Sequence, residues 1–106
     1  MAKYLVQAKY VGEGLKGLLK EGGSSRRAIL QNTLKSIGGT LESLYYCFGE
    51  YDILGVMEVP DNVTAASFAL TVSATGLVTT MTTVLMSPEE MDEVAKKSPT
   101  YRGPGQ

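Results

Sequence analysis

Hydrophobic and polar residues alternate in the first part of the chain, from Tyr4 to Val11. The even-numbered positions are apolar, whereas the odd-numbered ones include Gln7 and Lys9. A period of two predicts a strand with one buried face and one wetter face. Further apolar runs with high strand propensity predict three more strands, at residues 41–48, 51–59 and 77–86.

Apolar residues at helical spacing predict helices between these strands. Leucines recur in this way in residues 12–20 and 25–37, and Ser24 or Ser25 is expected to cap the second segment. Asp61 is a further expected N-cap. The residues after it place a clear apolar stripe at i, i+3, i+4 and i+7, formed by Ala65, Phe68, Ala69 and Val72. A short acidic helix is predicted from Pro88 to Lys96, capped by Ser87.

The second and third predicted strands are separated only by a two-residue turn, Gly49-Glu50. Parallel neighbours need a connection of about a dozen residues or more, so these two strands must be antiparallel. The run from Tyr51 to Val59 is almost entirely apolar. This pattern predicts a central strand that is covered on both faces.

The element order is β-α-β-β-α-β followed by a C-terminal helix, which predicts an α+β, ferredoxin-like domain. Two helices are expected to cover one face of a four-stranded antiparallel sheet. The domain is predicted to span residues 1–96, with a flexible tail at 97–106. The other sheet face would remain open and apolar, so we expect a homodimer packed sheet to sheet, or a higher oligomer.

Composition narrows the classes of function. Ten Lys and Arg residues oppose eleven Asp and Glu residues, and a net charge of -1 argues against bulk electrostatic binding of nucleic acid. The chain has one cysteine and no histidine, so no metal site and no cofactor is predicted, and histidine-based catalysis is excluded. No apolar run approaches the roughly 20 residues that span a bilayer. We expect no membrane association and a cytoplasmic location.

A glycine-rich segment follows the first strand, at residues 12–17 (Gly-Glu-Gly-Leu-Lys-Gly). Its spacing is that of a dinucleotide-binding fingerprint. Such a fingerprint needs a parallel β-α-β unit, whereas the next strand here enters an antiparallel hairpin. We therefore interpret the segment as a flexible connection between strand and helix.

Residues 48–54 (Phe-Gly-Glu-Tyr-Asp-Ile-Leu) and 59–62 (Val-Pro-Asp-Asn) resemble the GYD domain family, named for a Gly-Tyr-Asp signature. Gly38-Gly39, the alanine-rich second helix and the threonine-rich last strand strengthen the resemblance, which covers roughly residues 3 to 90. The resemblance implies a ferredoxin-like fold that assembles as a dimeric α+β barrel. The family has no established biochemical function. A similar hairpin occurs in the effector-binding domains of leucine-responsive-type regulators, whose DNA-binding domain this chain lacks, and cofactor-free oxygenases share the barrel.

The candidate site residues follow from these patterns. Tyr51 and Asp52 either hold the hairpin, with Asp52 accepting backbone N–H groups, or lie at the mouth of a cavity. A cavity between sheet and helices would be lined by tyrosines and hydroxyls. Its candidate ligand-binding residues are Tyr10, Tyr46, Met57, Thr80 and Thr82, together with Tyr51 and Asp52.

No catalytic residue can be named from the sequence. The pattern favours a small homo-oligomeric protein that binds a small apolar or aromatic molecule or serves as an assembly module. A cofactor-free enzyme, such as an oxygenase or isomerase using the cavity, is the alternative. A third hypothesis is a partner that works only through protein contacts.

Overall fold

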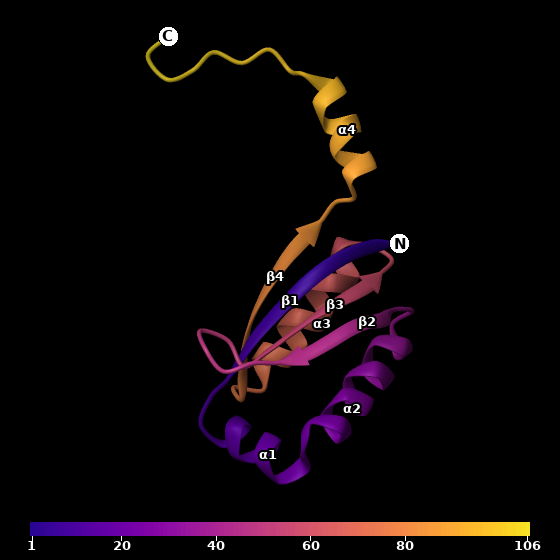
Figure 1. Cartoon of the computed structure of the whole chain (residues 1–106), viewed down its shortest axis with the longest axis vertical. Coiled ribbons are helices and arrows are strands. Elements are labelled where there is room, and N and C mark those ends of the chain that lie inside the picture. Colours follow the sequence, from indigo (N-terminus) through magenta and orange to yellow (C-terminus); the bar gives the residue numbers. More distant parts are fainter.

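The computed structural model describes residues 1–106 and contains four strands and four helices (Figure 1). Their bounds are β1 Ala2–Tyr10, α1 Glu13–Glu21, α2 Gly23–Ser36, β2 Thr40–Tyr46, β3 Ile53–Val59, α3 Asn62–Ala74, β4 Val78–Leu85 and α4 Pro88–Lys97. The predicted α+β class and the additional C-terminal helix are confirmed. No helix of the chain combines the length and the apolar character needed to cross a membrane.

The strands form one antiparallel sheet in the order β2-β3-β1-β4. β1 pairs with β3 on one side, where Tyr4 is opposite Met57, and with β4 on the other, where Tyr4 is opposite Val84. This is the predicted ferredoxin-like arrangement, and the two helical segments predicted at residues 12–20 and 25–37 form two helices between β1 and β2. Because all pairings are antiparallel, the sheet lacks the parallel β-α-β unit that a dinucleotide fingerprint requires.

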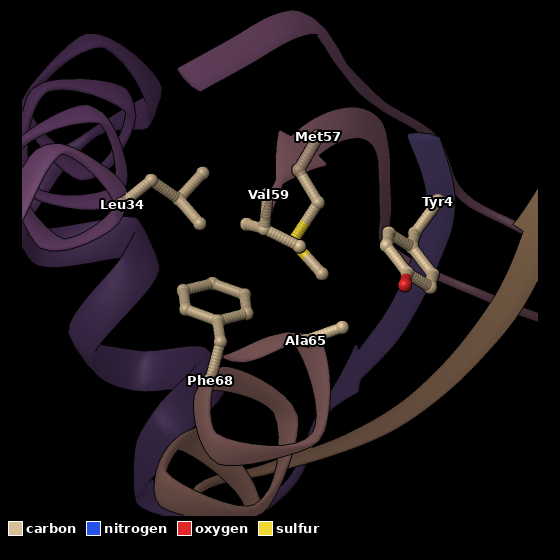
Figure 2. Close-up of a cluster of buried hydrophobic side chains, with 6 residues drawn as sticks. All are labelled: Tyr4, Leu34, Met57, Val59, Ala65 and Phe68. Atoms are coloured by element: carbon tan, nitrogen blue, oxygen red, sulfur yellow. The ribbon is translucent and has the colours of Figure 1, made fainter. Parts of the chain in front are cut away.

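Helices α2 and α3 pack on the same face of the sheet and enclose the main core (Figure 2). The apolar stripe predicted for α3 contributes to this core, and Asp61 caps the helix as predicted, accepting a hydrogen bond from the Thr64 N–H at 2.8 Å. The predicted alternation of β1 is also confirmed, since its even-numbered positions face the helices. The buried core side chains are Tyr4, Leu34, Met57, Val59, Ala65 and Phe68.

A β-bulge in β2 explains why hydrophobic residues alternate imperfectly along this strand. The ladder between β2 and β3 shifts between Leu41 and Ser43, which makes Glu42 the extra residue. A bulge changes which face the following residues occupy. Both Leu41 and Leu44 therefore point to the helix-covered face, where their methyl groups lie near Gly55.

The hairpin between β2 and β3 is longer than the two-residue turn predicted at residues 49–50. Residues 47–52 all lie outside the two strands, although the Cys47 N–H still donates to the Asp52 carbonyl at 2.8 Å. The prediction is wrong because the strand pairing ends where the hairpin projects beyond the sheet (Figure 1). Phe48, the last residue of the strand predicted at residues 41–48, is fully exposed there.

Helices α1 and α2 are separate elements that meet at Gly22, whose φ of 86° only glycine adopts easily. α2 begins at Gly23 and has no side-chain cap, so the cap predicted at Ser24 or Ser25 is wrong. The chain changes direction at the glycine. Both serines consequently lie inside the first turn of the helix.

The glycine-rich segment after β1 has a structural explanation. Gly14 lies so close to the start of β4 that a Cβ atom on it would be 2.0 Å from the Leu77 carbonyl oxygen. The same oxygen accepts a hydrogen bond from the Val11 N–H at 2.9 Å. This approach anchors α1 to the start of β4.

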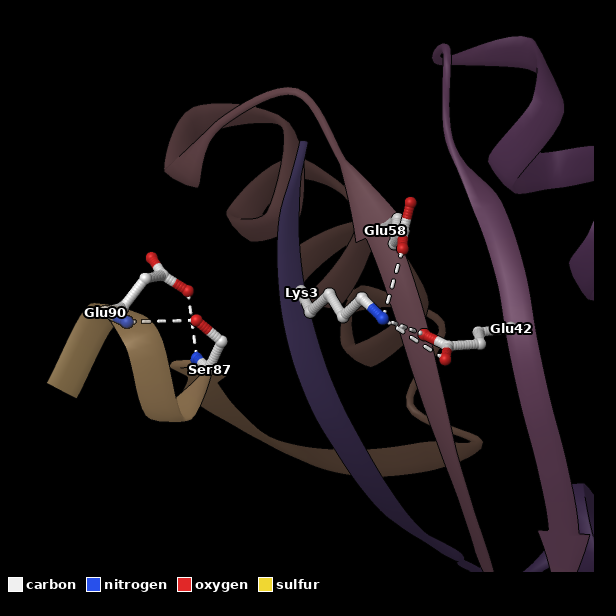
Figure 3. A network of polar contacts seen from close by, with 5 residues as sticks. All are labelled: Lys3, Glu42, Glu58, Ser87 and Glu90. Atoms are coloured by element: carbon white, nitrogen blue, oxygen red, sulfur yellow. Dashed lines mark hydrogen bonds and ion pairs between the residues drawn. The ribbon is translucent and has the colours of Figure 1, made fainter. Parts of the chain in front are cut away.

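The other face of the sheet carries no helix, so it is open in the single chain. Leu54 and Val56 of β3 are only partly buried there, and the prediction that β3 is covered on both faces is wrong for one copy of the chain. At one end of this face, Lys3 forms ion pairs with Glu42 at 3.0 Å and with Glu58 at 3.4 Å (Figure 3). Hydrogen bonding to Glu42, and then its charge, raises the pKa of Lys3.

Candidate functional site

A cavity of about 80 Å³ lies between the sheet and helices α2 and α3. Of its fourteen lining residues eleven are hydrophobic, and the remainder are a glycine, Arg26 and Thr80. Leu34, Met57 and Phe68, which belong to the lining, point toward one another from α2, β3 and α3 (Figure 2). The cavity is thus part of the hydrophobic core.

Gly55 leaves the sheet side of this cavity recessed. It lies at the centre of β3, opposite Val6 of β1 and Leu44 of β2. A Cβ atom here would be 2.7 Å from the Ser43 carbonyl oxygen, so the backbone of β2 leaves no room for a side chain. A glycine inside a strand often marks such a close approach. Because glycine fills no space above the sheet, a hollow remains under the two helices.

Two polar side chains of the lining, Thr80 and Arg26, have partners within the chain. The Thr80 and Ser73 hydroxyl oxygens are 2.9 Å apart and share a hydrogen bond. The Arg26 guanidinium lies 3.6 Å from the Glu21 carboxylate. No buried side-chain nitrogen or oxygen lacks a hydrogen-bond partner. Polar groups are therefore few in the lining, and its chemistry suits an apolar molecule.

Three of the residues predicted from the sequence come together here. Tyr10, Met57 and Thr80 line the cavity from three adjacent strands, β1, β3 and β4. Thr82 lies one inward position further along β4, opposite Val6, but it is exposed and does not line the cavity. A ligand role for any of these residues stays a prediction.

Tyr46 lies beside the cavity without lining it. Its hydroxyl donates a hydrogen bond to the Gly23 carbonyl at 3.0 Å, which joins the end of β2 to the start of α2. Partial burial raises the pKa of Tyr46, and the neighbouring Tyr10 adds to this, while Arg26 and Arg27 oppose it. The Tyr46 side chain thus closes the region where the two helices α1 and α2 meet.

Tyr51 and Asp52 lie outside the cavity and contact β4 and β1. The Asp52 carboxylate accepts a hydrogen bond from the Tyr10 N–H at 2.9 Å, and the Asp52 N–H donates to the Ala8 carbonyl at 2.9 Å. Asp52 thereby extends the pairing of β1 with β3 by one residue before the start of β3. The Tyr51 hydroxyl contacts the Met81 sulfur at 3.4 Å. Neither residue lines the cavity.

Sequence reasoning missed Arg26 and Gly55 as parts of the site. Arg26, Leu30 and Leu34 follow one another at four-residue steps, so they lie on one side of α2. That spacing was a usable signal for Arg26. Gly55 gives no such signal, because its effect depends on the backbone of the neighbouring strand.

The structure contains no group of three or more His, Cys, Asp or Glu side chains placed to hold a metal ion. Cys47, the single cysteine, is exposed in the hairpin, where its sulfur lies 3.2 Å from the Tyr51 carbonyl oxygen. The cavity between sheet and helices is therefore the candidate site with the most defined chemistry.

Comparison with known families gives one match: the model of the GYD domain matches residues 4–95. The chain belongs to the GYD domain family. The match extends from β1 into α4 and confirms the resemblance inferred from the hairpin. No curated protein and no solved structure matched this GYD domain.

Proposed function

We propose that this GYD domain binds a small apolar molecule in the cavity between the sheet and helices α2 and α3. The supporting observation is a hollow lined almost wholly by hydrophobic side chains, next to a tightly buried core. Protein interiors are close-packed, and an empty cavity destabilises the fold. A bound molecule would replace the missing contacts.

The volume limits the size of the ligand. A hollow of about 80 Å³ is roughly half of the engineered cavity of about 150 Å³ that binds benzene. A ligand of more than a few heavy atoms therefore requires α2 or α3 to move outward. α2 packs on β2, and α3 packs on β4 and β3, so either helix can shift without breaking a strand pairing.

The same geometry favours binding over cofactor-free catalysis. Proton transfer needs an acid or base within hydrogen-bond reach of the ligand. Asp52, the carboxylate suggested by the sequence, is outside the lining and accepts the Tyr10 N–H. Arg26, Thr80 and Tyr10 supply the remaining polar groups of the lining, and none of them is a carboxylate or an imidazole.

Filling the cavity tests the binding proposal. Val6→Ile adds one methyl group to the lining, whereas Val63→Ile adds it to a position on α3 that is 80% exposed. Benzene is the probe, and binding is followed by NMR chemical shifts. We expect Val6→Ile to weaken benzene binding several-fold and to stabilise the fold by about 0.5–1 kcal/mol, with no change for Val63→Ile.

Two results would contradict this proposal. The first is that the unchanged chain shows no saturable chemical-shift changes with benzene. The second is that benzene binds Val6→Ile as tightly as it binds the unchanged chain. A loss of stability in Val6→Ile would mean that the side chains already fill the space, since overpacking a core is unfavourable.

Assembly into a homodimer is a second candidate function, favoured by the open face of the sheet. Leu5 and Val56 are opposite each other at its centre, and Leu54 and Met81 flank Gln7 in the next row. These apolar side chains have no cover in one copy of the chain. A two-fold axis would bury the same patch on both copies.

Light scattering at micromolar concentration tests this assembly. We expect a dimer for the unchanged chain and a monomer for Leu5→Lys, which places a charge at the centre of the open face. Leu70→Lys is the control, because Leu70 is 69% exposed on α3 and belongs to the other side of the molecule. A monomeric unchanged chain would refute the assembly.

A further inference from the structure

Helix α4 extends away from the rest of the molecule beyond the end of β4 (Figure 1). None of its residues is buried. The chain is 55 Å long in its greatest dimension and has a radius of gyration of 16.8 Å, whereas a compact chain of this length has about 13 Å. We refer to residues 86–97 as the arm.

Figure 3 shows the N-terminal cap of α4, formed by Ser87 and Glu90, and none of the helix residues is buried. The Ser87 hydroxyl accepts a hydrogen bond from the Glu90 N–H at 3.0 Å, and the Glu90 carboxylate accepts one from the Ser87 N–H at 2.9 Å. Helices shorter than about 12–15 residues are marginal in water when isolated. With ten residues, α4 needs a packing partner to be stable.

One side of the arm is apolar and is bordered by a carboxylate without a partner. Met91 and Val94 are three residues apart, on the same side of the helix, and are 51% and 46% exposed. Asp92 borders this side and takes part in none of the ion pairs of the chain, unlike Glu93, which pairs with Lys96 at 3.6 Å.

A groove with complementary features follows the opposite edge of the sheet, between α2 and β2. It consists of two hollows of about 340 Å³ and 280 Å³, and both are lined by Arg27 and Leu44. Tyr45 and Tyr46 line one of them and are 67% and 39% exposed. Arg27 belongs to no ion pair, in contrast to Arg26. We refer to this surface as the α2–β2 groove.

We propose that the arm of one chain docks in the α2–β2 groove of a second copy of this chain. Met91 and Val94 pack against Leu44 and the groove tyrosines, and Asp92 faces Arg27. Methionine packs favourably against aromatic rings, and a pair of otherwise unpartnered charges fixes the orientation. The inference rests on the homodimer proposed above, in which two-fold symmetry gives every arm one groove.

The arm does not bring its first turns to the groove of its own chain. Met86 and Ser87 connect β4 to α4, and two residues span at most about 7 Å. β4 and β2 are the two edges of the sheet, and three strand spacings separate them by about 14 Å. A second copy on the open face can instead place its β2 edge beside β4 of the first.

Paired cysteines test the docking directly in the full chain. Cys47→Ser removes the native thiol, and Arg27→Cys with Asp92→Cys places one cysteine in the groove and one on the arm. A disulfide requires Cα atoms within about 7 Å of each other. We expect covalent dimers after air oxidation, seen by non-reducing electrophoresis. The control carries Lys20→Cys, on the exposed surface of α1, in place of Arg27→Cys, and is expected to form no covalent dimer.

A disulfide within one chain, or no disulfide at all, overturns the docking. Light scattering on the unchanged chain separates this failure from that of the homodimer: a dimer without the crosslink refutes only the arm, and a monomer refutes both. Charge reversal gives a second readout. We expect Arg27→Glu to weaken dimerisation several-fold and added Asp92→Arg to restore it, and an unchanged dissociation constant in Arg27→Glu overturns the ion pair.

Discussion

Replacing Gly14 with alanine is expected to destabilise this domain, whereas the same change at Gly17 is expected to stabilise it. At Gly14 the new Cβ would lie 2.0 Å from the Leu77 carbonyl oxygen and 2.8 Å from the carbonyl carbon, while at Gly17 it would meet nothing within 4 Å. Both glycines belong to α1. The difference between the two variants therefore isolates the contact between α1 and the start of β4.

Three contributions set the magnitude. Alanine is favoured over glycine in a helix by about 0.8–1 kcal/mol. Overpacking costs about 1–3 kcal/mol, and here the obstacle is backbone, which cannot rotate aside as a side chain does. Moving α1 outward also strains the 2.9 Å hydrogen bond from the Val11 N–H to Leu77, worth about 1 kcal/mol. The sum is a loss of about 1–3 kcal/mol for Gly14→Ala and a gain of about 0.5–1 kcal/mol for Gly17→Ala.

Urea unfolding followed by circular dichroism measures both changes. All variants are compared at one protein concentration, because the proposed dimerisation would make the apparent stability depend on concentration. Melting temperatures should move in opposite directions, by about 4–8 °C per kcal/mol. If both variants shift the unfolding midpoint upward by a similar amount, helix propensity alone governs them, and the close approach of Gly14 to Leu77 is refuted.

Three further predictions concern the core, a helix cap and a tyrosine. Leu34→Ala truncates a fully buried side chain and should lower the free energy of unfolding by about 2–5 kcal/mol in the same urea assay. Hydrogen bonds from the Thr64 N–H and then its hydroxyl lower the pKa of Asp61. Its stabilisation is therefore present above the unfolded-state pKa and is lost as the pH falls through the lower folded-state pKa, so Asp61→Ala should flatten the acid side of a melting-temperature profile. Burial, and then Tyr10, raises the pKa of Tyr46, so Tyr46→Phe should remove the component that ionises late in an ultraviolet absorbance titration.

Each of these predictions has an outcome that contradicts it. An unchanged unfolding midpoint in Leu34→Ala would mean that the contact of α2 with the sheet is loose in solution. An acid profile identical to that of the unchanged chain would show that Asp61 does not hold the first turn of α3. Phenol ionisation that is the same with and without Tyr46 would place this side chain in open solvent.

Local patterns were sufficient for most of the fold. The alternation along β1 and the cap at Asp61 depend on neighbours in sequence, and both are observed. The prediction of a serine cap for α2 was wrong because Gly22 reaches the left-handed region and starts the helix earlier. The prediction of a two-residue turn was wrong because the extent of strand pairing depends on what packs beneath the hairpin, and Phe48 is fully exposed.

The candidate site was predictable only in part. Tyr10, Met57 and Thr80 are inward positions of three adjacent strands, so alternation brings them together once the strand order is known. Thr82 shares their face, but the strand pattern does not tell where the cover of the helices ends. The hollow itself depends on Gly55 and the backbone of β2 next to it, which is a tertiary contact that one-dimensional spacing does not encode.

The main chain and the side chain of Tyr10 have different structural roles. Its main-chain N–H holds the Asp52 carboxylate, and its side chain lines the cavity. Every residue except proline can supply that N–H. Substitution at position 10 can therefore change the lining of the cavity while β1 and β3 keep their alignment. In evolutionary terms the signature hairpin and the cavity are free to diverge separately, so two proteins that share the hairpin can inherit one architecture with differently lined cavities.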